Sequence, residues 1–236
     1  MPPGDLGRAW ILLAAAYAAA AVIFSLWPGI DLWVSGLFYR PGAGFFLARS
    51  GALELLRETV WGASVLVALA AAGLLVLSAL GRPLPIGTRA EAAFVFLLYL
   101  LGPVLLVDGL LKRFWGRARP ASVTEFGGTL DFTVALVPAD QCHRNCAFVS
   151  GEGAAAAALG VTFALVLPRL LPQLPPRMRR PMIALAILLP LAGMALRVMT
   201  GRHFLSDTVF AVLFVMTIAL ALGRFLRRAD GRCGAC

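Results

Sequence analysis

The sequence predicts an all-α, polytopic membrane protein with six transmembrane helices and an interfacial helix in the first outer loop. Hydrophobic residues make up 60% of the 236 residues and charged residues only 14%. A soluble domain is typically about 45–50% apolar. The apolar runs are continuous and rich in alanine, which favours helices over the alternating strands of a membrane β-barrel. We therefore expect a single integral membrane domain over residues 1–236.

Six apolar runs have about the length of 20 residues that a bilayer-crossing helix needs. They cover residues 9–27, 60–80, 92–111, 148–167, 182–199 and 207–222. The first run is longer than the apolar core of a signal peptide, which has about 7–15 residues. We therefore expect the first run to be retained as a span.

The net charge of +9 and the sequence pI of about 10.6 bear on the partners of the protein. No nucleic-acid-binding motif accompanies the basic residues, so no nucleic-acid partner is expected. In a membrane protein, excess positive charge suits anionic lipid head groups and phosphorylated substrates. The expected partners are the phospholipid bilayer and a lipid phosphate, and the sequence carries no signal for an oligomeric state.

An even number of spans places both termini on one side of the membrane. The two sides carry similar counts of Lys and Arg, so the positive-inside rule decides only after the arginines assigned to chemistry below are discounted. The termini then face the cytoplasm, and the long polar loop 112–147 faces outward.

The outer connection 28–59 precedes the second span. Its segment FFLARSGALELLRETVW mixes apolar residues with Arg49, Glu54, Arg57 and Glu58. This pattern is typical of a helix that lies in the membrane interface. Such a helix could roof an entry for lipid or form an ordinary amphipathic cover.

Two cysteine pairs lie on opposite sides of the membrane in this topology. Cys142 and Cys146 are on the outer side, where a short disulfide can form. Cys233 and Cys236 form a CxxC at the cytoplasmic end, and two thiols alone do not complete a four-ligand zinc site. We expect the tail pair to be free thiols.

The first polar cluster ends the third span, in VDGLLKRFWGRARP. Lys112 and Arg119 are seven residues apart, which is about two helical turns, so they share a face if the helix continues. Asp108 lies one turn before Lys112 and is expected to pair with it. Alone, this cluster is more typical of a basic collar of snorkelling side chains at a helix end.

The second cluster, Ser150-Gly151-Glu152, begins the fourth span. Ser is a favoured N-cap, and the unpaired N–H groups of a helix N-terminus can bind an anion. Plain capping explains the serine equally well. A carboxylate at the mouth of a membrane helix, however, is costly and is usually kept for function.

The third cluster joins the fifth and sixth spans, in LRVMTGRHFLSDTVFA. His203 and Asp207 are four residues apart, one helical turn, so they are expected side by side. A carboxylate bonded to one imidazole nitrogen fixes the tautomer and leaves the other nitrogen available as a nucleophile or base. A His–Asp pair can also serve only as a structural link between helices.

The predicted topology brings the three clusters to one membrane surface, because spans three and five end there and spans four and six begin there. Together they supply cations, a hydroxyl, backbone amides and a histidine beside a carboxylate. Arginine forks match phosphate oxygens. No aspartate-rich metal site accompanies them, so no metal or cofactor is expected and the protein's own cations would neutralise the phosphate.

Over about residues 90–225, the sequence resembles the type-2 phosphatidic acid phosphatase superfamily of integral membrane lipid phosphatases. The family pattern is Lys-x6-Arg-Pro, Pro-Ser-Gly-His and Ser-Arg-x5-His-x3-Asp. The first motif is complete from Lys112 to Arg119-Pro120, and the third is present from Arg197 through His203 to Asp207. The second keeps Ser150-Gly151. The order of the motifs and the expected topology match the family as well.

The resemblance implies a role for each matching residue. His203 would attack phosphorus and carry a phosphohistidine intermediate, and Asp207 would orient it. The residues that would hold the phosphate are Lys112, Arg119, Ser150, Gly151 and Arg197.

Three positions depart from the family pattern: Val149 replaces Pro, Leu196 replaces Ser, and Glu152 replaces the His that protonates the leaving oxygen in the family. We hypothesise that Glu152 takes over this acid role. Alternatively, the leaving group needs little acid help and Glu152 binds a hydroxyl or amine of the head group. His143 in the outer loop is a further candidate acid.

The expected function is a lipid phosphatase of the bacterial cytoplasmic (inner) membrane, with the site on the periplasmic or exterior side. Candidate substrates are lipid A, a polyprenyl diphosphate and phosphatidylglycerol phosphate, and the context DQCHRNCAFVSGE is similar to lipid A phosphatase-like members. The alternatives are a phosphotransferase that passes the phosphate to an acceptor lipid, or a catalytically silent lipid-binding or transport protein.

Overall fold

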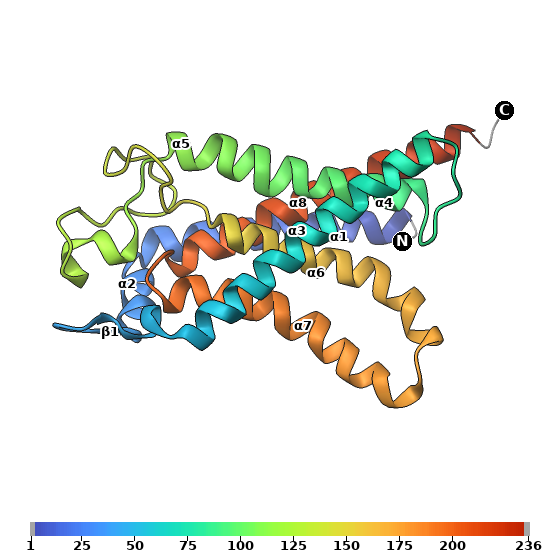
Figure 1. Cartoon of the computed structure of the whole chain (residues 1–236). Coiled ribbons are helices and arrows are strands. Elements are labelled where there is room, and N and C mark those ends of the chain that lie inside the picture. Colours follow the sequence, from blue (N-terminus) through green and yellow to red (C-terminus); the bar gives the residue numbers. More distant parts are fainter. Residues whose placement is uncertain (1–2, 234–236) are drawn as a thin grey trace.

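The computed structural model describes residues 3–233, and their side chains from residue 6 to residue 226. Six helices in this part are long and apolar enough to cross a membrane: Leu6–Leu26, Gly51–Ala79, Arg89–Phe114, Gly151–Gln173, Pro176–Met199 and Leu205–Leu226. Each overlaps one predicted span, so the all-α prediction with six spanning helices is confirmed. The helices run roughly along one axis and form an elongated bundle (Figure 1).

The bounds of the elements, in chain order, are as follows. The first half contains α1 (Pro3–Leu26), α2 (Gly29–Gly36), β1 (Tyr39–Arg40), β2 (Gly44–Phe45), η1 (Phe46–Arg49), α3 (Gly51–Ala79), α4 (Arg89–Tyr99), η2 (Leu100–Leu111) and α5 (Lys112–Phe114). The second half contains η3 (Pro120–Ser122), η4 (Thr124–Phe126), α6 (Gly151–Leu170), η5 (Leu171–Gln173), α7 (Pro176–Met199) and α8 (Leu205–Cys233).

The third span combines α4, η2 and α5 into one continuous helical path, of which η2 is a π-helix that contains Pro103. Proline has no backbone N–H and clashes with the carbonyl of the preceding turn, so an α-helical ladder cannot continue unchanged through it. π-Helical stretches are mostly single turns, whereas η2 has 12 residues. Here the stretch ends directly before Lys112.

The first outer connection differs in detail from the predicted interfacial helix. Residues 51–61 are not a separate surface helix but the first turns of α3, which runs unbroken from Gly51 to Ala79 with Ser50 as its N-cap. No proline interrupts this stretch, so the helix continues into the apolar span. The remainder of the connection consists of α2 and the antiparallel pair β1–β2, in which Tyr39 lies opposite Phe45.

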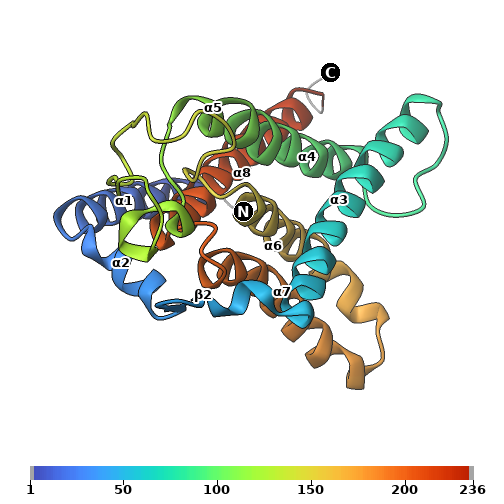
Figure 2. The ribbon, with the colours of Figure 1, turned by 60° about the vertical axis from the view of Figure 1, so that its left-hand side comes forward.

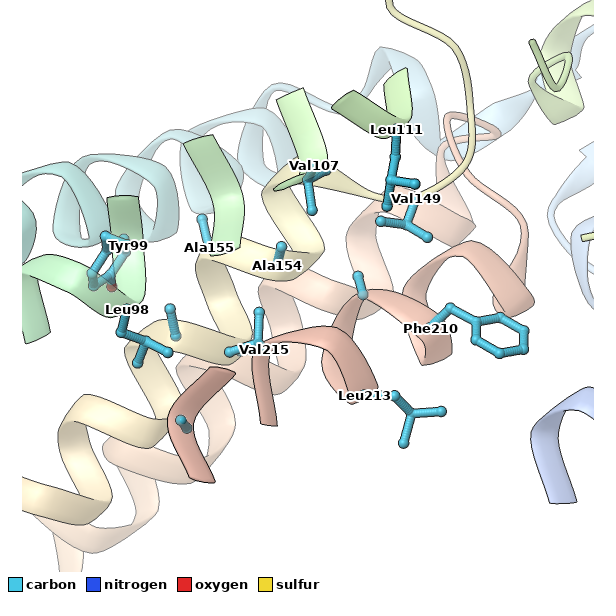
Figure 3. Packing of buried hydrophobic residues seen from close by; sticks show 14 of the residues in the cluster. Leu98, Tyr99, Val107, Leu111, Val149, Ala154, Ala155, Phe210, Leu213 and Val215 are labelled. Carbon is cyan, nitrogen blue, oxygen red and sulfur yellow. The ribbon is translucent and has the colours of Figure 1, made fainter. Parts of the chain in front are cut away.

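Helix α6 is the central helix, in contact with α3, α4, η2, α7 and α8. Its run of alanines 154–158 is buried, and these small side chains allow the neighbouring helices to approach closely. Figure 3 shows Ala154 and Ala155 facing Val107 of η2 and Val215 of α8. Large apolar residues on the outer faces of α1, α3 and α7 are exposed, as expected for lipid-facing helices.

The two termini lie at one end of the bundle, and the loops that follow α2 and α5 lie at the other, which we call the loop end (Figures 1 and 2). The terminal end also carries the α3–α4 turn and the linker around η5. At that end Arg169 forms an ion pair with Glu91, whose side chain also completes a capping box with Thr88. The arrangement agrees with the predicted topology of six spans.

Candidate active site

The three predicted clusters meet at the loop end of the bundle. Lys112 ends the third span, Gly151 begins α6, and His203 lies in the short connection between α7 and α8. The backbone N–H of Ser150 donates to the carbonyl of Asp207 at 3.2 Å, which joins the starts of α6 and α8. The convergence predicted from the topology is therefore present.

His203 is almost completely buried, with 1% exposure. Its Nδ1 lies 2.7 Å from the carbonyl oxygen of Ala147. A carbonyl can only accept, so Nδ1 carries the hydrogen and Nε2 keeps its lone pair. Burial lowers the pKa of His203, the nearby carboxylate of Asp207 opposes this, and the charges of Arg197 and Lys112 add to the lowering. Burial thus favours the neutral imidazole, and the hydrogen bond at Nδ1 leaves the lone pair on Nε2.

Asp207 does not hold His203 as directly as the four-residue spacing predicted. Its Oδ2 lies 3.8 Å from Nδ1 of His203 and accepts a hydrogen bond from the N–H of Phe204 at 2.8 Å. The reason is that α8 begins at Leu205, so His203 lies outside the helix and one-turn spacing does not apply to it. The carbonyl of Ala147 fixes the tautomer instead, and Asp207 acts on the ring through its charge.

Lys112 forms the predicted ion pair with Asp108, with 2.8 Å between Nζ and Oδ1. The pair lies directly over Gly151, where a Cβ would be only 2.6 Å from Nζ of Lys112 and 2.8 Å from the Asp108 carboxylate. A side chain at this position would push the ends of Lys112 and Asp108 away from the start of α6. The absence of a side chain brings the ammonium group beside the first N–H groups of α6.

Ser150 is buried and caps α6, because its Oγ accepts from the N–H of Gly153 at 3.0 Å. A hydroxyl that accepts one hydrogen bond still has its own hydrogen to donate. The capping interpretation is thus confirmed, and the proposed contact with phosphate is compatible with it.

The two arginines of the motifs are partly buried and have few protein partners. Arg119 donates from Nη2 to the carbonyl of Asn145 at 2.9 Å, and burial lowers its pKa, with a smaller effect from the charge of Arg202. The buried Nε of Arg197 has no hydrogen-bond partner among the described residues. These donors suit an anion that enters the site.

Glu152 lies between two guanidinium groups and is 26% exposed. Its Oε1 is 3.3 Å from Nη1 of Arg57 and 3.5 Å from Nη1 of Arg197. Arg57 also pairs with Glu54 at 2.6 Å. The carboxylate of Glu152 therefore lies beside Arg197 on one side and α3 on the other, next to a pocket lined by Trp61 and Ser64.

The sequence analysis missed a buried ionic network behind His203. Arg117 is 0% exposed and donates to Asp31 Oδ2 at 2.8 Å, Asp207 Oδ1 at 2.6 Å and Ser206 Oγ at 2.8 Å. Asp31 in turn accepts from the backbone N–H of Ser206 at 2.9 Å. In the sequence, Arg117 is one of several cations in VDGLLKRFWGRARP, and the one signal for Asp31 is a carboxylate within the apolar stretch GIDLWVSG.

The predicted disulfide between Cys142 and Cys146 is present, whereas the tail cysteines lie beyond the residues whose side chains are described. His143, the further candidate acid, is exposed on the loop that the disulfide closes. It makes no side-chain hydrogen bond to any described residue.

Comparison with known proteins places the chain in a family. Residues 92–230 match the sequence model of the PAP2 superfamily. A lipid A 4'-phosphatase of Rhizobium etli is 34% identical over 91% of this chain and 86% of its own length, and one of Rhizobium leguminosarum is 35% identical over 90% and 91%. A lipid A 4'-phosphatase of Francisella tularensis subsp. novicida is 31% identical over 83% of this chain and 86% of its own length. No solved structure matches significantly.

Proposed function

Since the chain belongs to the PAP2 superfamily, we propose that it is a membrane lipid phosphatase that hydrolyses a phosphate monoester of lipid A through a phosphohistidine at His203. The observation that carries this proposal is the hydrogen bond from Nδ1 of His203 to Ala147, 2.7 Å long, which leaves Nε2 as a nucleophile. The cations of Lys112, Arg119 and Arg197 border the same site and supply charge for a phosphate group.

Lipid A is the favoured substrate because three relatives that match most of the chain are lipid A 4'-phosphatases. The 4'-phosphate is accordingly the favoured position. Phosphatidylglycerol phosphate, a monoester on a different lipid, and a polyprenyl diphosphate, which presents a phosphoanhydride, remain the comparison substrates.

In the first step of the proposed reaction, Nε2 of His203 bonds to phosphorus and the bond from phosphorus to the lipid oxygen breaks. Lys112, Arg119 and Arg197, with the hydroxyl of Ser150 and the N–H of Gly151, stabilise the negative charge on the phosphoryl oxygens. The charge of Asp207 stabilises the positive imidazole ring that forms.

The leaving oxygen needs a proton unless it is already a good leaving group. Glu152 in its protonated form is proposed as the donor, because it lies 3.5 Å from Arg197 and so at the edge of the proposed phosphate-binding residues; the donation leaves its carboxylate. In the second step, water attacks phosphorus, inorganic phosphate leaves, and His203 returns to its neutral form. A carboxylate at Glu152 can accept the proton of that water.

Metal independence and location are parts of the same proposal. The site holds its own cations for the phosphate, so we expect turnover to persist in a chelator such as EDTA. The loop end is assigned to the periplasmic side of the bacterial inner membrane, because the arginine-rich linker and tail lie at the terminal end.

The testing experiment measures phosphate release from purified protein on a panel of the three lipid phosphates, with His203→Ala as the matched control. We expect release from lipid A to exceed the other two and to disappear in the variant. Equal release by both proteins would remove His203 as the nucleophile. A labelled acceptor lipid in the same assay distinguishes transfer to lipid from transfer to water.

A further inference from the structure

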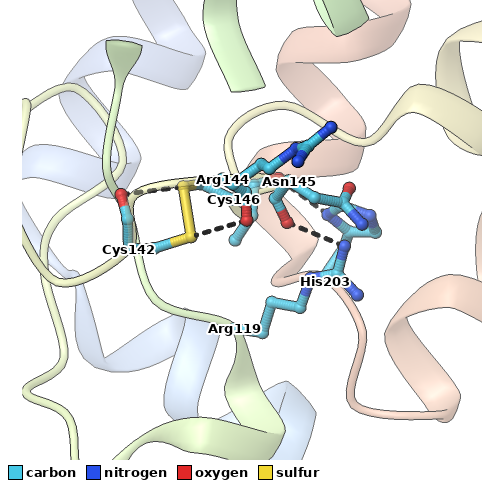
Figure 4. The surroundings of a disulfide bond; sticks show 7 residues. Arg119, Cys142, Arg144, Asn145, Cys146 and His203 are labelled. Atoms are coloured by element: carbon cyan, nitrogen blue, oxygen red, sulfur yellow. Dashed lines mark hydrogen bonds between the residues drawn. A yellow bond between two sulfur atoms is a disulfide. The ribbon is translucent and has the colours of Figure 1, made fainter. Parts of the chain in front are cut away.

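The disulfide between Cys142 and Cys146 closes a small ring that lies against the proposed active site. The Cα atoms of the two cysteines are 5.6 Å apart, and Cys146 is buried. Figure 4 shows the disulfide beside Arg119, Asn145 and His203. The ring therefore belongs to the wall of the site and not to a distant surface loop.

The carbonyl of Asn145, within the ring, accepts the hydrogen bond from Nη2 of Arg119 at 2.9 Å. Asn145 has a φ of 55°, in the left-handed region that residues other than glycine rarely adopt. A closed ring restricts the other conformations that this residue would otherwise populate. The ring thus holds a carbonyl in the orientation that positions a proposed phosphate ligand.

The residue that follows the ring positions the nucleophile. The carbonyl of Ala147 accepts from Nδ1 of His203 at 2.7 Å. Two backbone hydrogen bonds hold the same segment. The N–H of Cys146 donates to the carbonyl of Lys112 at 3.3 Å, and the N–H of Ala147 donates to the carbonyl of Arg117 at 2.9 Å. Three consecutive residues therefore link the disulfide to Arg119, His203 and the end of the third span.

We propose that the Cys142–Cys146 disulfide is a positioning element of the active site, which sets the orientation of Arg119 and the tautomer of His203. This inference rests on the proposed phosphatase function. A dithiol reductant would convert the disulfide into two thiols, with oxidation of the dithiol to its own disulfide. The reduced loop would release the carbonyls of Asn145 and Ala147, and turnover would fall.

A local effect of this kind is separable from global stability. A disulfide stabilises a fold less when it closes a short ring than when it closes a long one. The sequence separation here is only 4 residues. A misplacement of about 1 Å in a reacting group, in contrast, can lower turnover by about 100-fold.

The experiment uses full-length protein in which both tail cysteines are replaced (C233S/C236S), so that only the outer pair responds to redox reagents. Phosphate release is measured oxidised, after reduction with dithiothreitol, and after reoxidation, and maleimide labelling reports the redox state. We expect reduction to lower kcat by about 10- to 100-fold and reoxidation to restore it. The further variant C142S/C146S should have the kcat of the reduced protein, and dithiothreitol should not change it.

Two readouts separate positioning from simple stabilisation. The affinity for vanadate, a phosphate analogue, should weaken on reduction because Arg119 is released, while the unfolding temperature in detergent changes by only a few degrees. Unchanged kcat and vanadate affinity in fully reduced protein would overturn the inference, as would a loss of activity that merely follows unfolding.

Failure of this inference and failure of the proposed function give different results. If the oxidised protein releases no more phosphate than His203→Ala, the function fails, and vanadate binding in the two redox states still tests the role of the ring. If the oxidised protein is active and indifferent to reduction, only the role of the ring fails.

Discussion

Arg117 and Arg119 are two residues apart in one loop, yet the fold gives them opposite surroundings. Arg117 is fully buried, pairs with Asp31 and Asp207, and lies 4.4 Å over the ring of Phe204. Arg119 is partly exposed and bonds to one backbone carbonyl, with no carboxylate of the described residues within ion-pair distance. The charge of Arg117 is already neutralised by the protein, whereas that of Arg119 is available to an anionic substrate.

The position of Asp31 shows why this difference matters for chemistry. Arg117 lies between two buried carboxylates, those of Asp31 and Asp207, behind His203. Burial raises the pKa of Asp31, and the charge of Arg117 opposes the shift. In the proposed mechanism, the charge of Asp207 favours the positive ring that forms when Nε2 of His203 bonds to phosphorus. Arg117 would then act on the nucleophile indirectly by holding Asp207, and Arg119 would bind the substrate.

Replacement of Arg117 by Ala is expected to have the largest effect, because it leaves two buried carboxylates without their partner. Removing one partner of a buried pair costs about 3–5 kcal/mol. Thermal unfolding in detergent should show a strongly destabilised protein, or one that does not accumulate in the membrane. Arg117→Lys keeps the charge but loses the several N–H donors of the guanidinium group, so its unfolding temperature should lie between those of the wild type and Arg117→Ala. A variant Arg117→Ala that unfolds like the wild type would contradict the network.

Replacement of Arg119 by Ala should instead affect catalysis with little effect on stability. The loss of one donor to the transition-state charge lowers turnover by about 100- to 1000-fold. Steady-state kinetics on the lipid phosphate should show this drop, and the unfolding temperature should stay close to that of the wild type. If Arg119→Ala destabilised the fold as Arg117→Ala does, the contrast between the two arginines would be lost.

Replacement of Glu152 by Gln tests the proposed proton donor. Like Arg119, and unlike Arg117, this residue is proposed to act on the substrate. A general acid contributes at least about 100-fold when the leaving group is poor. We expect kcat/KM, which reports the first step only, to fall by this factor on an alkyl lipid phosphate and to change little on an aryl phosphate, whose leaving oxygen needs no proton. Equal losses on both substrates would assign Glu152 to binding or to the orientation of Arg197.

The dependence of kcat/KM on pH should give the smallest effect. The ordinary pKa of a histidine is about 6.5. Because burial lowers the pKa of His203, its ring is still neutral at that pH, and activity should fall only at lower pH. Stability should also decline there, since the unfolded chain takes up a proton that the folded chain does not. Two substrates whose phosphate groups differ in pKa should lose activity at the same acidic pH. If the pH of this loss shifted with the pKa of the substrate, His203 would not control it.

The spans and the three motifs could be predicted from the sequence because both are local patterns. A bilayer needs about 20 apolar residues for each crossing, and the chain supplies six such runs. Once the spans are placed, their alternating direction brings Lys112, Ser150 and His203 to one end. The pairing of Asp108 with Lys112 also follows from helical spacing alone.

The interactions that were not predicted depend on contacts between distant or irregular segments. Asp31 and Arg117 are 86 residues apart, and no periodic pattern relates them. The partner of His203 is a backbone carbonyl in a loop, which side-chain types do not reveal. The start of α3 was ambiguous because charged residues near an interface fit both a surface helix and the end of a long spanning helix.

The central claim, that His203 carries the phosphate during turnover, is tested most directly by trapping the intermediate. Wild-type protein is mixed with lipid labelled in its phosphate, quenched under alkaline conditions within one turnover, and analysed for label on histidine. We predict an alkali-stable, acid-labile label on His203 that is absent from His203→Ala. Full turnover with no label on protein at any quench time, or label on another residue, would contradict the account.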